Sequence, residues 1–76
     1  MGNEYAMERQ IISLVDKVKK LVPAVKTSEI EYFTYQMSER SGIGMVSILT
    51  SLCEDLQNGV PFEHTAVGKS RLLALW

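Results

Sequence analysis

The chain has 76 residues and a mass of 8.6 kDa, and 46% of its residues are hydrophobic while 22% are charged. Such a chain is too apolar to stay disordered and long enough for one modest core, which excludes a second domain or a deep enclosed active site. Eight Lys and Arg stand against nine Asp and Glu, so the net charge of −1 provides no overall attraction for nucleic acid or an anionic membrane.

The single cysteine and the start of the chain indicate where the protein works. Cys53 cannot form an internal disulfide and cannot hold a metal ion alone, which favours a reducing, cytoplasmic setting. Charged residues at Glu4, Glu8 and Arg9 interrupt the first apolar stretch. We therefore expect neither a signal peptide nor a membrane-spanning helix.

A first helix is predicted from Asn3, a candidate cap, to Val22, where Pro23 disfavours further helix. Apolar residues recur in it at intervals of three and four, the spacing of one helix face. They are Ile11, Leu14, Val15, Val18, Leu21 and Val22.

A second helix is predicted to run to about Ser41. Ser28 and Glu31 have the spacing of a capping box, and Thr27 is a rival cap. Gly42 is the expected left-handed residue at the end. The inner stripe of this helix consists of Ile30, Phe33 and Met37.

A third helix is predicted between Gly44 and Asn58-Gly59, which end it. Its apolar residues form two columns, which is wide for a helix that packs on one side only. We therefore expect it to be the central helix of the fold. The columns contain Met45, Val46, Ile48, Leu49, Leu52, Cys53 and Leu56.

The last segment leaves two alternatives open, because either Thr65 or Ser70 could cap a helix and Gly68 lies between them. No alternating strand pattern occurs in the sequence. We therefore predict an all-α fold: one domain over residues 1–76, a compact bundle of three to four short helices with a helix-turn-helix-like pair in the middle.

Few residues are suited to catalysis. Cys53 and His64 are the only members of their kinds, and Cys53 falls on the apolar side of the third helix, where a lone cysteine is usually an inert hydrophobe. His64 should lie in a loop or at a helix entry, solvated or capping. We therefore expect no catalytic residue, cofactor or metal site, and no enzymatic activity.

Residues 31–56 resemble the general outline of a DNA-binding helix-turn-helix, two helices joined by a short turn that contains glycine. The residues that fit this outline are Met37, Gly42, Ile43 and Ile48. Two positions depart from it, because Ser38 replaces the usual small residue and Ser41 replaces an apolar one.

This resemblance implies a second helix that reads bases, and there the sequence offers only Ser47, Thr50 and Ser51, with no Lys or Arg. Phosphate contacts would have to come from basic residues elsewhere. The candidates are Lys17, Lys19, Lys20, Lys26 and Arg40.

Large apolar side chains exceed what a core of this size should hold, so we expect some of them to contact another chain. The candidate partner-binding residues are Tyr32, Tyr35, Phe62, Leu72, Leu73, Leu75 and Trp76. The simplest partner is a second copy, because two-fold dimers are the commonest oligomers. We expect a small cytoplasmic regulatory protein of the adaptor or inhibitor type, acting as a homodimer by protein–protein interaction, and the alternative is a helix-turn-helix transcriptional regulator.

Overall fold

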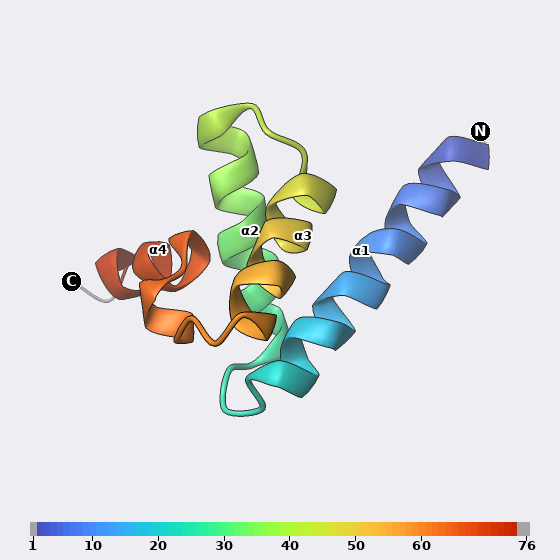
Figure 1. Ribbon diagram of the computed structural model, residues 1–76. Coiled ribbons are helices and arrows are strands. Elements are labelled where there is room, and N and C mark those ends of the chain that lie inside the picture. Colours follow the sequence, from blue (N-terminus) through green and yellow to red (C-terminus); the bar gives the residue numbers. More distant parts are fainter. Residues whose placement is uncertain (1, 75–76) are drawn as a thin grey trace.

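Four α-helices and one short 3-10 helix form the computed structural model, which describes the backbone of residues 2–74 and the side chains of residues 8–73 (Figure 1). In chain order they are α1 (Gly2–Leu21), α2 (Thr27–Ser41), α3 (Met45–Gln57), the 3-10 helix η1 (Phe62–His64) and α4 (Ala66–Ala74). No strand occurs within residues 2–74, so the predicted all-α bundle is confirmed.

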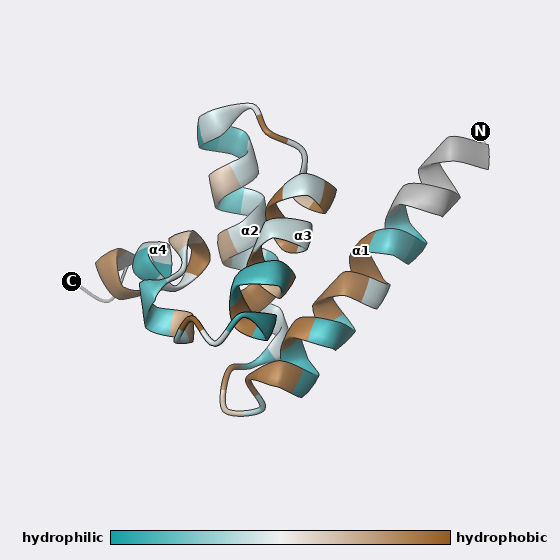
Figure 2. Cartoon of the chain, in the orientation of Figure 1, coloured by the Kyte–Doolittle hydropathy of each residue, from teal (hydrophilic) through white to brown (hydrophobic). Residues whose placement is uncertain are grey.

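The core lies where α3 packs against both α1 and α2, with its most extensive contacts to α1. Figure 1 shows α2 and α3 between α1 on one side and α4 on the other. Figure 2 shows apolar residues where α1 and α3 meet and again near the C-terminal end of α4. The prediction that α3 contacts neighbours on more than one side is confirmed. The buried apolar residues are Val15, Val18, Val25, Ile30, Phe33, Ile48, Leu49, Leu52, Cys53, Phe62 and Val67.

The predicted end of α2 agrees with the structure, but its predicted start does not. Gly42 has a φ of 73° and its N–H donates to the Ser38 carbonyl at 2.9 Å, so the left-handed stop is confirmed. The predicted capping box is wrong, because Lys26 is the N-cap and Ser28 lies inside the first turn. Val25 explains the earlier start: it is buried, and its N–H donates to the Val22 carbonyl at 3.0 Å, so the chain is already set to enter the helix at Lys26.

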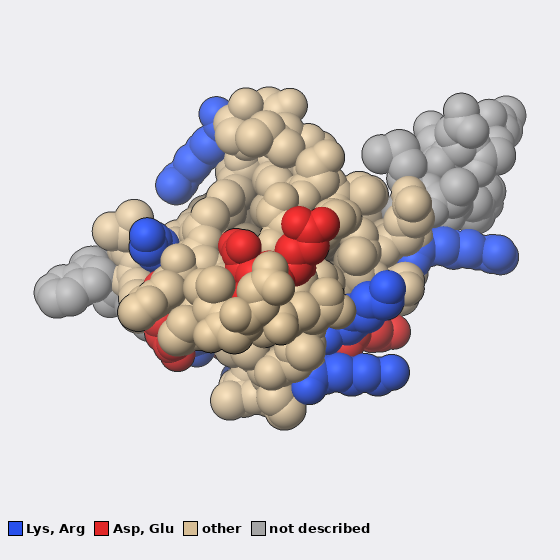
Figure 3. Space-filling model, in the orientation of Figure 1, with Lys and Arg blue, Asp and Glu red and all other residues tan. Residues whose placement is uncertain are grey.

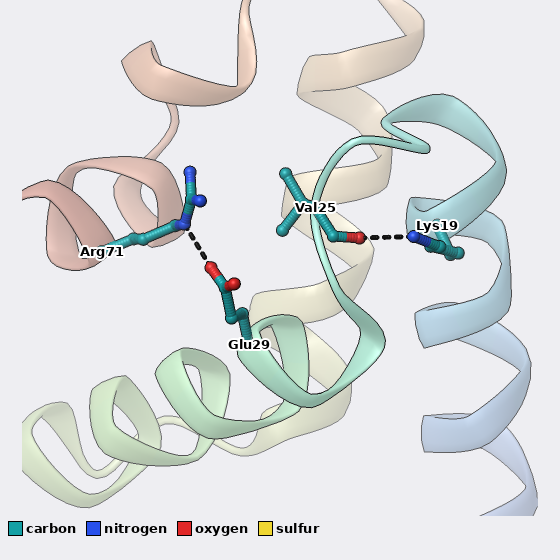
Figure 4. Close-up of polar contacts among 4 residues, drawn as sticks. All are labelled: Lys19, Val25, Glu29 and Arg71. Carbon is teal, nitrogen blue, oxygen red and sulfur yellow. Dashed lines mark hydrogen bonds and ion pairs between the residues drawn. The ribbon is translucent and has the colours of Figure 1, made fainter.

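Lys19 closes the turn between α1 and α2. Its ammonium donates to the carbonyl oxygens of Pro23 at 2.6 Å and Val25 at 2.8 Å (Figure 4). These are carbonyls just past the end of α1, where a cation is favoured by the helix dipole. Lys19 therefore has a structural role in the turn.

Thr65 caps the start of α4. Of the two predicted caps, Thr65 and Ser70, the structure therefore has Thr65. The buried Thr65 hydroxyl donates to the Phe62 carbonyl at 2.6 Å and accepts the N–H of Gly68 at 3.1 Å. This second bond satisfies one of the free N–H groups of the first turn. Farther along α4, Arg71 forms an ion pair with Glu29 of α2 (Figure 4).

Gly68 is required where α4 crosses η1. A Cβ at this position would lie 1.7 Å from the carbonyl oxygen of Phe62 and 2.6 Å from its carbonyl carbon. Both atoms belong to the backbone, so a side-chain rotation cannot relieve the clash. The close approach of α4 to η1 therefore depends on glycine here.

We predict that Gly68→Ala lowers the free energy of unfolding by about 3 kcal/mol, the upper part of the range for overpacked sites. Urea unfolding followed by far-UV circular dichroism measures this change. Gly44→Ser is the matched control, because no atom lies within 4 Å of a Cβ at Gly44 and the N-cap of α3 has no side-chain hydrogen bond. Equal stability of Gly68→Ala and the unmodified protein would contradict this packing.

Candidate functional site

The residues predicted to bind a partner fall into two separate groups. Tyr32 and Tyr35 are 54% and 53% exposed on α2, and Leu72 and Leu73 are 41% and 72% exposed on α4. Phe62 is a correction: η1 turns its side chain into the core, where it is 5% exposed. Leu75 and Trp76 lie outside the described residues.

The two tyrosines border a groove between α1 and α2, here named the α1–α2 groove, with a volume of about 610 Å³. That volume falls within the range of pockets that hold ligands, roughly 300–1,000 Å³. Ile12 of α1 borders the same groove and is 58% exposed. The residues that line it are Glu8, Ile11, Ile12, Ser28, Glu31, Tyr32, Tyr35 and Met45.

Ile12 was not among the residues predicted to bind a partner. The available signal was its position, because Ile12 follows Ile11 and so lies off the apolar stripe of α1. A large apolar residue off the stripe is either a solvated exception or part of a second contact surface. Ile12 and the tyrosines line the same groove, which favours the second contact surface. This is seen only in the folded structure, where α1 and α2 pack together.

Local contacts hold the two tyrosine rings in place. The Tyr32 ring packs edge-on against Phe33, with ring centroids 5.1 Å apart, and its hydroxyl accepts a hydrogen bond from the Gln36 side chain at 2.8 Å. Hydrogen bonding to Glu39 and the negative charge of that carboxylate raise the pKa of the Tyr35 hydroxyl. Both tyrosines thus present ring and hydroxyl in defined positions, as interface aromatics do.

The α1–α2 groove is electronegative. Glu8 and Glu31 line it, and no Lys or Arg is among the described lining residues. Across the side chains of residues 8–73 the one ion pair joins Arg71 to Glu29, so the carboxylates of Glu8 and Glu31 have no cationic partner there. The groove therefore combines an apolar floor with two unneutralised negative charges at its edge.

The second group of exposed apolar residues forms a ridge on α4, here named the α4 ridge and made of Lys69, Leu72 and Leu73. These residues are spaced at i, i+3 and i+4, so they share one face of the helix. Lys69 is exposed, and the sequence of α4 contains no acidic residue. The ridge therefore combines leucines with a positive charge, whereas the charges at the groove are negative.

The helix pair predicted to resemble a helix-turn-helix is present as α2, the turn at residues 42–44, and α3. Ser47, Thr50 and Ser51 are exposed on α3, but the Thr50 hydroxyl is engaged with the carbonyl of Val46 at 2.7 Å. Acidic side chains occupy the centre of the face that presents α3 (Figure 3). The charges on α3 are those of Glu54 and Asp55.

The predicted basic residues do not gather into one patch. Figure 3 shows basic side chains spread around the edge of the face that presents α3. Lys17, Lys20 and Lys26 are exposed towards the end of α1 and the start of α2, whereas Arg40 lies at the opposite end of α2. Lys19 is engaged in the turn.

A smaller groove of about 220 Å³ lies between the end of α2, α3 and the start of α4. Its walls include Met37, Ile43 and Leu52, and Ser47 and Ser51 also line it. Asp55 is the one charged residue among the described lining side chains.

Neither of the residues considered for catalysis, Cys53 and His64, lines the α1–α2 groove. Cys53 is buried in the core, and burial raises the pKa of its thiol, with Lys17 acting in the opposite sense. His64 is exposed in η1. The described residues contain no group of three or more His, Cys, Asp or Glu arranged to hold a metal ion. None of the described helices combines the length and apolar character needed to cross a membrane.

We predict that duplex DNA of mixed sequence does not bind the protein even at low salt, because α3 presents acids to the phosphate backbone. Fluorescence anisotropy of a labelled duplex, at low and at physiological salt, measures this. The contrary result is binding that weakens steeply with salt and is reduced by Lys17→Ala or Lys20→Ala.

No family model matches the chain, and no curated protein or solved structure is significantly similar to it.

Proposed function

We propose that the protein is a small non-enzymatic regulator that acts by binding another protein, and that the α1–α2 groove is its docking site. The observation that supports this most strongly is the gathering of Ile12, Tyr32 and Tyr35 around one groove while each is more than half exposed. Contiguous exposed apolar surface of this kind marks interaction sites. Tyrosine is also enriched at protein interfaces.

The apolar lining and the two carboxylates of the groove indicate which kind of partner would fit it. Apolar side chains at helical spacing would fill the space between Ile12 and the tyrosines, as an amphipathic helix fills a groove. Lys or Arg beside those anchors would meet Glu8 and Glu31. The proposed partner is therefore an amphipathic helix with basic flanks, and its binding should weaken as salt screens the charges.

A synthetic helical peptide with leucines at i, i+3 and i+4 and flanking lysines provides the test. We predict that it binds the protein and that Tyr35→Ala weakens the affinity by about tenfold or more, since loss of a central interface aromatic costs roughly 2 kcal/mol. Fluorescence anisotropy of the labelled peptide measures both affinities. Because the Tyr35 side chain is half exposed, the variant should keep its fold.

Ile43→Ala is the matched control. Ile43 is also half exposed, but it lies in the turn before α3 and outside the α1–α2 groove. It should leave the affinity for the peptide unchanged. No peptide binding, or equal losses for Tyr35→Ala and Ile43→Ala, would contradict the proposed docking site.

A further inference from the structure

The α1–α2 groove and the α4 ridge have complementary properties on one chain. The groove is apolar with the carboxylates of Glu8 and Glu31 at its edge, and the ridge is apolar with the ammonium of Lys69 beside its leucines. Resting on the function proposed above, we infer that the occupant of the groove is the α4 ridge of a second copy of this chain.

The ridge matches the partner that the groove requires. Lys69, Leu72 and Leu73 provide one cation and two apolar anchors at the i, i+3, i+4 spacing with which helices enter grooves. Leu73 is the most exposed large apolar side chain among the described residues, so it gains the most from being covered. The absence of acids from α4 means that no like charge opposes Glu8 or Glu31.

A chain cannot place its own ridge in its own groove while folded as described. α4 packs on α2 and η1, and three features hold it there: the Thr65 cap, the close approach at Gly68, and the pair between Arg71 and Glu29. The groove lies between α1 and α2, and Figure 1 shows α2 and α3 between α1 and α4, so the ridge does not reach the groove of its own chain. The occupant must therefore come from another molecule.

Two-fold pairing uses both surfaces of each copy. The ridge of one copy enters the groove of the second, and the second copy returns the same contact, so no apolar patch of this kind is left exposed. A head-to-tail arrangement without the two-fold axis would leave one groove and one ridge free and would continue into a chain of molecules. A closed dimer covers all four surfaces when the two-fold axis passes between the groove and the ridge of each copy, on a face that both surfaces share.

Sedimentation equilibrium over micromolar to millimolar concentrations tests this pairing. We expect a dimer of twice the 8.6 kDa chain mass, and we expect Leu73→Asp to weaken the dimer at least about a hundredfold by placing a charge in an apolar contact. Ile43→Asp is the matched control, since Ile43 is an exposed apolar residue outside both surfaces, and it should leave the dimer intact. Circular dichroism verifies that each variant is folded.

Charge exchange tests which surfaces meet. Lys69→Glu and Glu31→Lys should each weaken the dimer about tenfold or more, because each leaves like charges facing one another. The double variant restores opposite charges and should recover most of the affinity. A double variant no stronger than the single ones would overturn the pairing of ridge with groove.

The outcomes separate this inference from the proposed function. A protein that stays monomeric at millimolar concentration but binds the leucine–lysine peptide at the groove overturns the second-copy occupant and leaves the docking site in place. A dimer that survives Leu73→Asp also overturns the inference. A monomer that fails to bind the peptide overturns both. If the ridge occupies the groove, Leu73→Asp should bind the peptide more tightly than the unmodified protein, because the competing ridge has been removed.

Discussion

The burial of α3 between α1 and α2 is the constraint on which the rest of the structure depends. Leu49 is completely buried and Leu52 nearly so, and α3 packs on both α1 and α2. The buried residues of α2 are Ile30, Phe33 and Thr34, and the side of α2 that carries the two tyrosines stays uncovered among the described residues. Tyr32 and Tyr35 remain exposed for that reason, and α4 packs on another part of α2.

Most of the fold could be predicted from the sequence because helical periodicity and glycine stops are local signals. The spacing of apolar residues in α1 and the two columns of α3 identified both helices, and Gly42 ended α2 as expected. The start of α2 could not be predicted in the same way, because it depends on the burial of Val25 in the preceding turn. The choice of Thr65 as the cap of α4 likewise depends on contacts with Phe62.

The candidate site was only partly predictable. Tyr32 and Tyr35 were predicted as partner-binding residues; they lie off the apolar stripe of α2, and both are more than half exposed. Phe62 gave no such signal, because its burial follows from the 3-10 turn that directs it inward. Ile12 became a site residue through the packing of α1 on α2, and such a pairing between distant segments is not encoded in the spacing of either helix.

The most direct measurement is a dilution series of the ¹⁵N-labelled protein followed by NMR. If the groove of one copy receives the ridge of another, amide signals near Ile12, Tyr32 and Tyr35 should shift on dilution together with those of Lys69, Leu72 and Leu73, along one common binding curve. Signals near Ile43 should stay in place. Shifts confined to one of the two surfaces, or centred on the turn at Ile43, would contradict the proposed pairing.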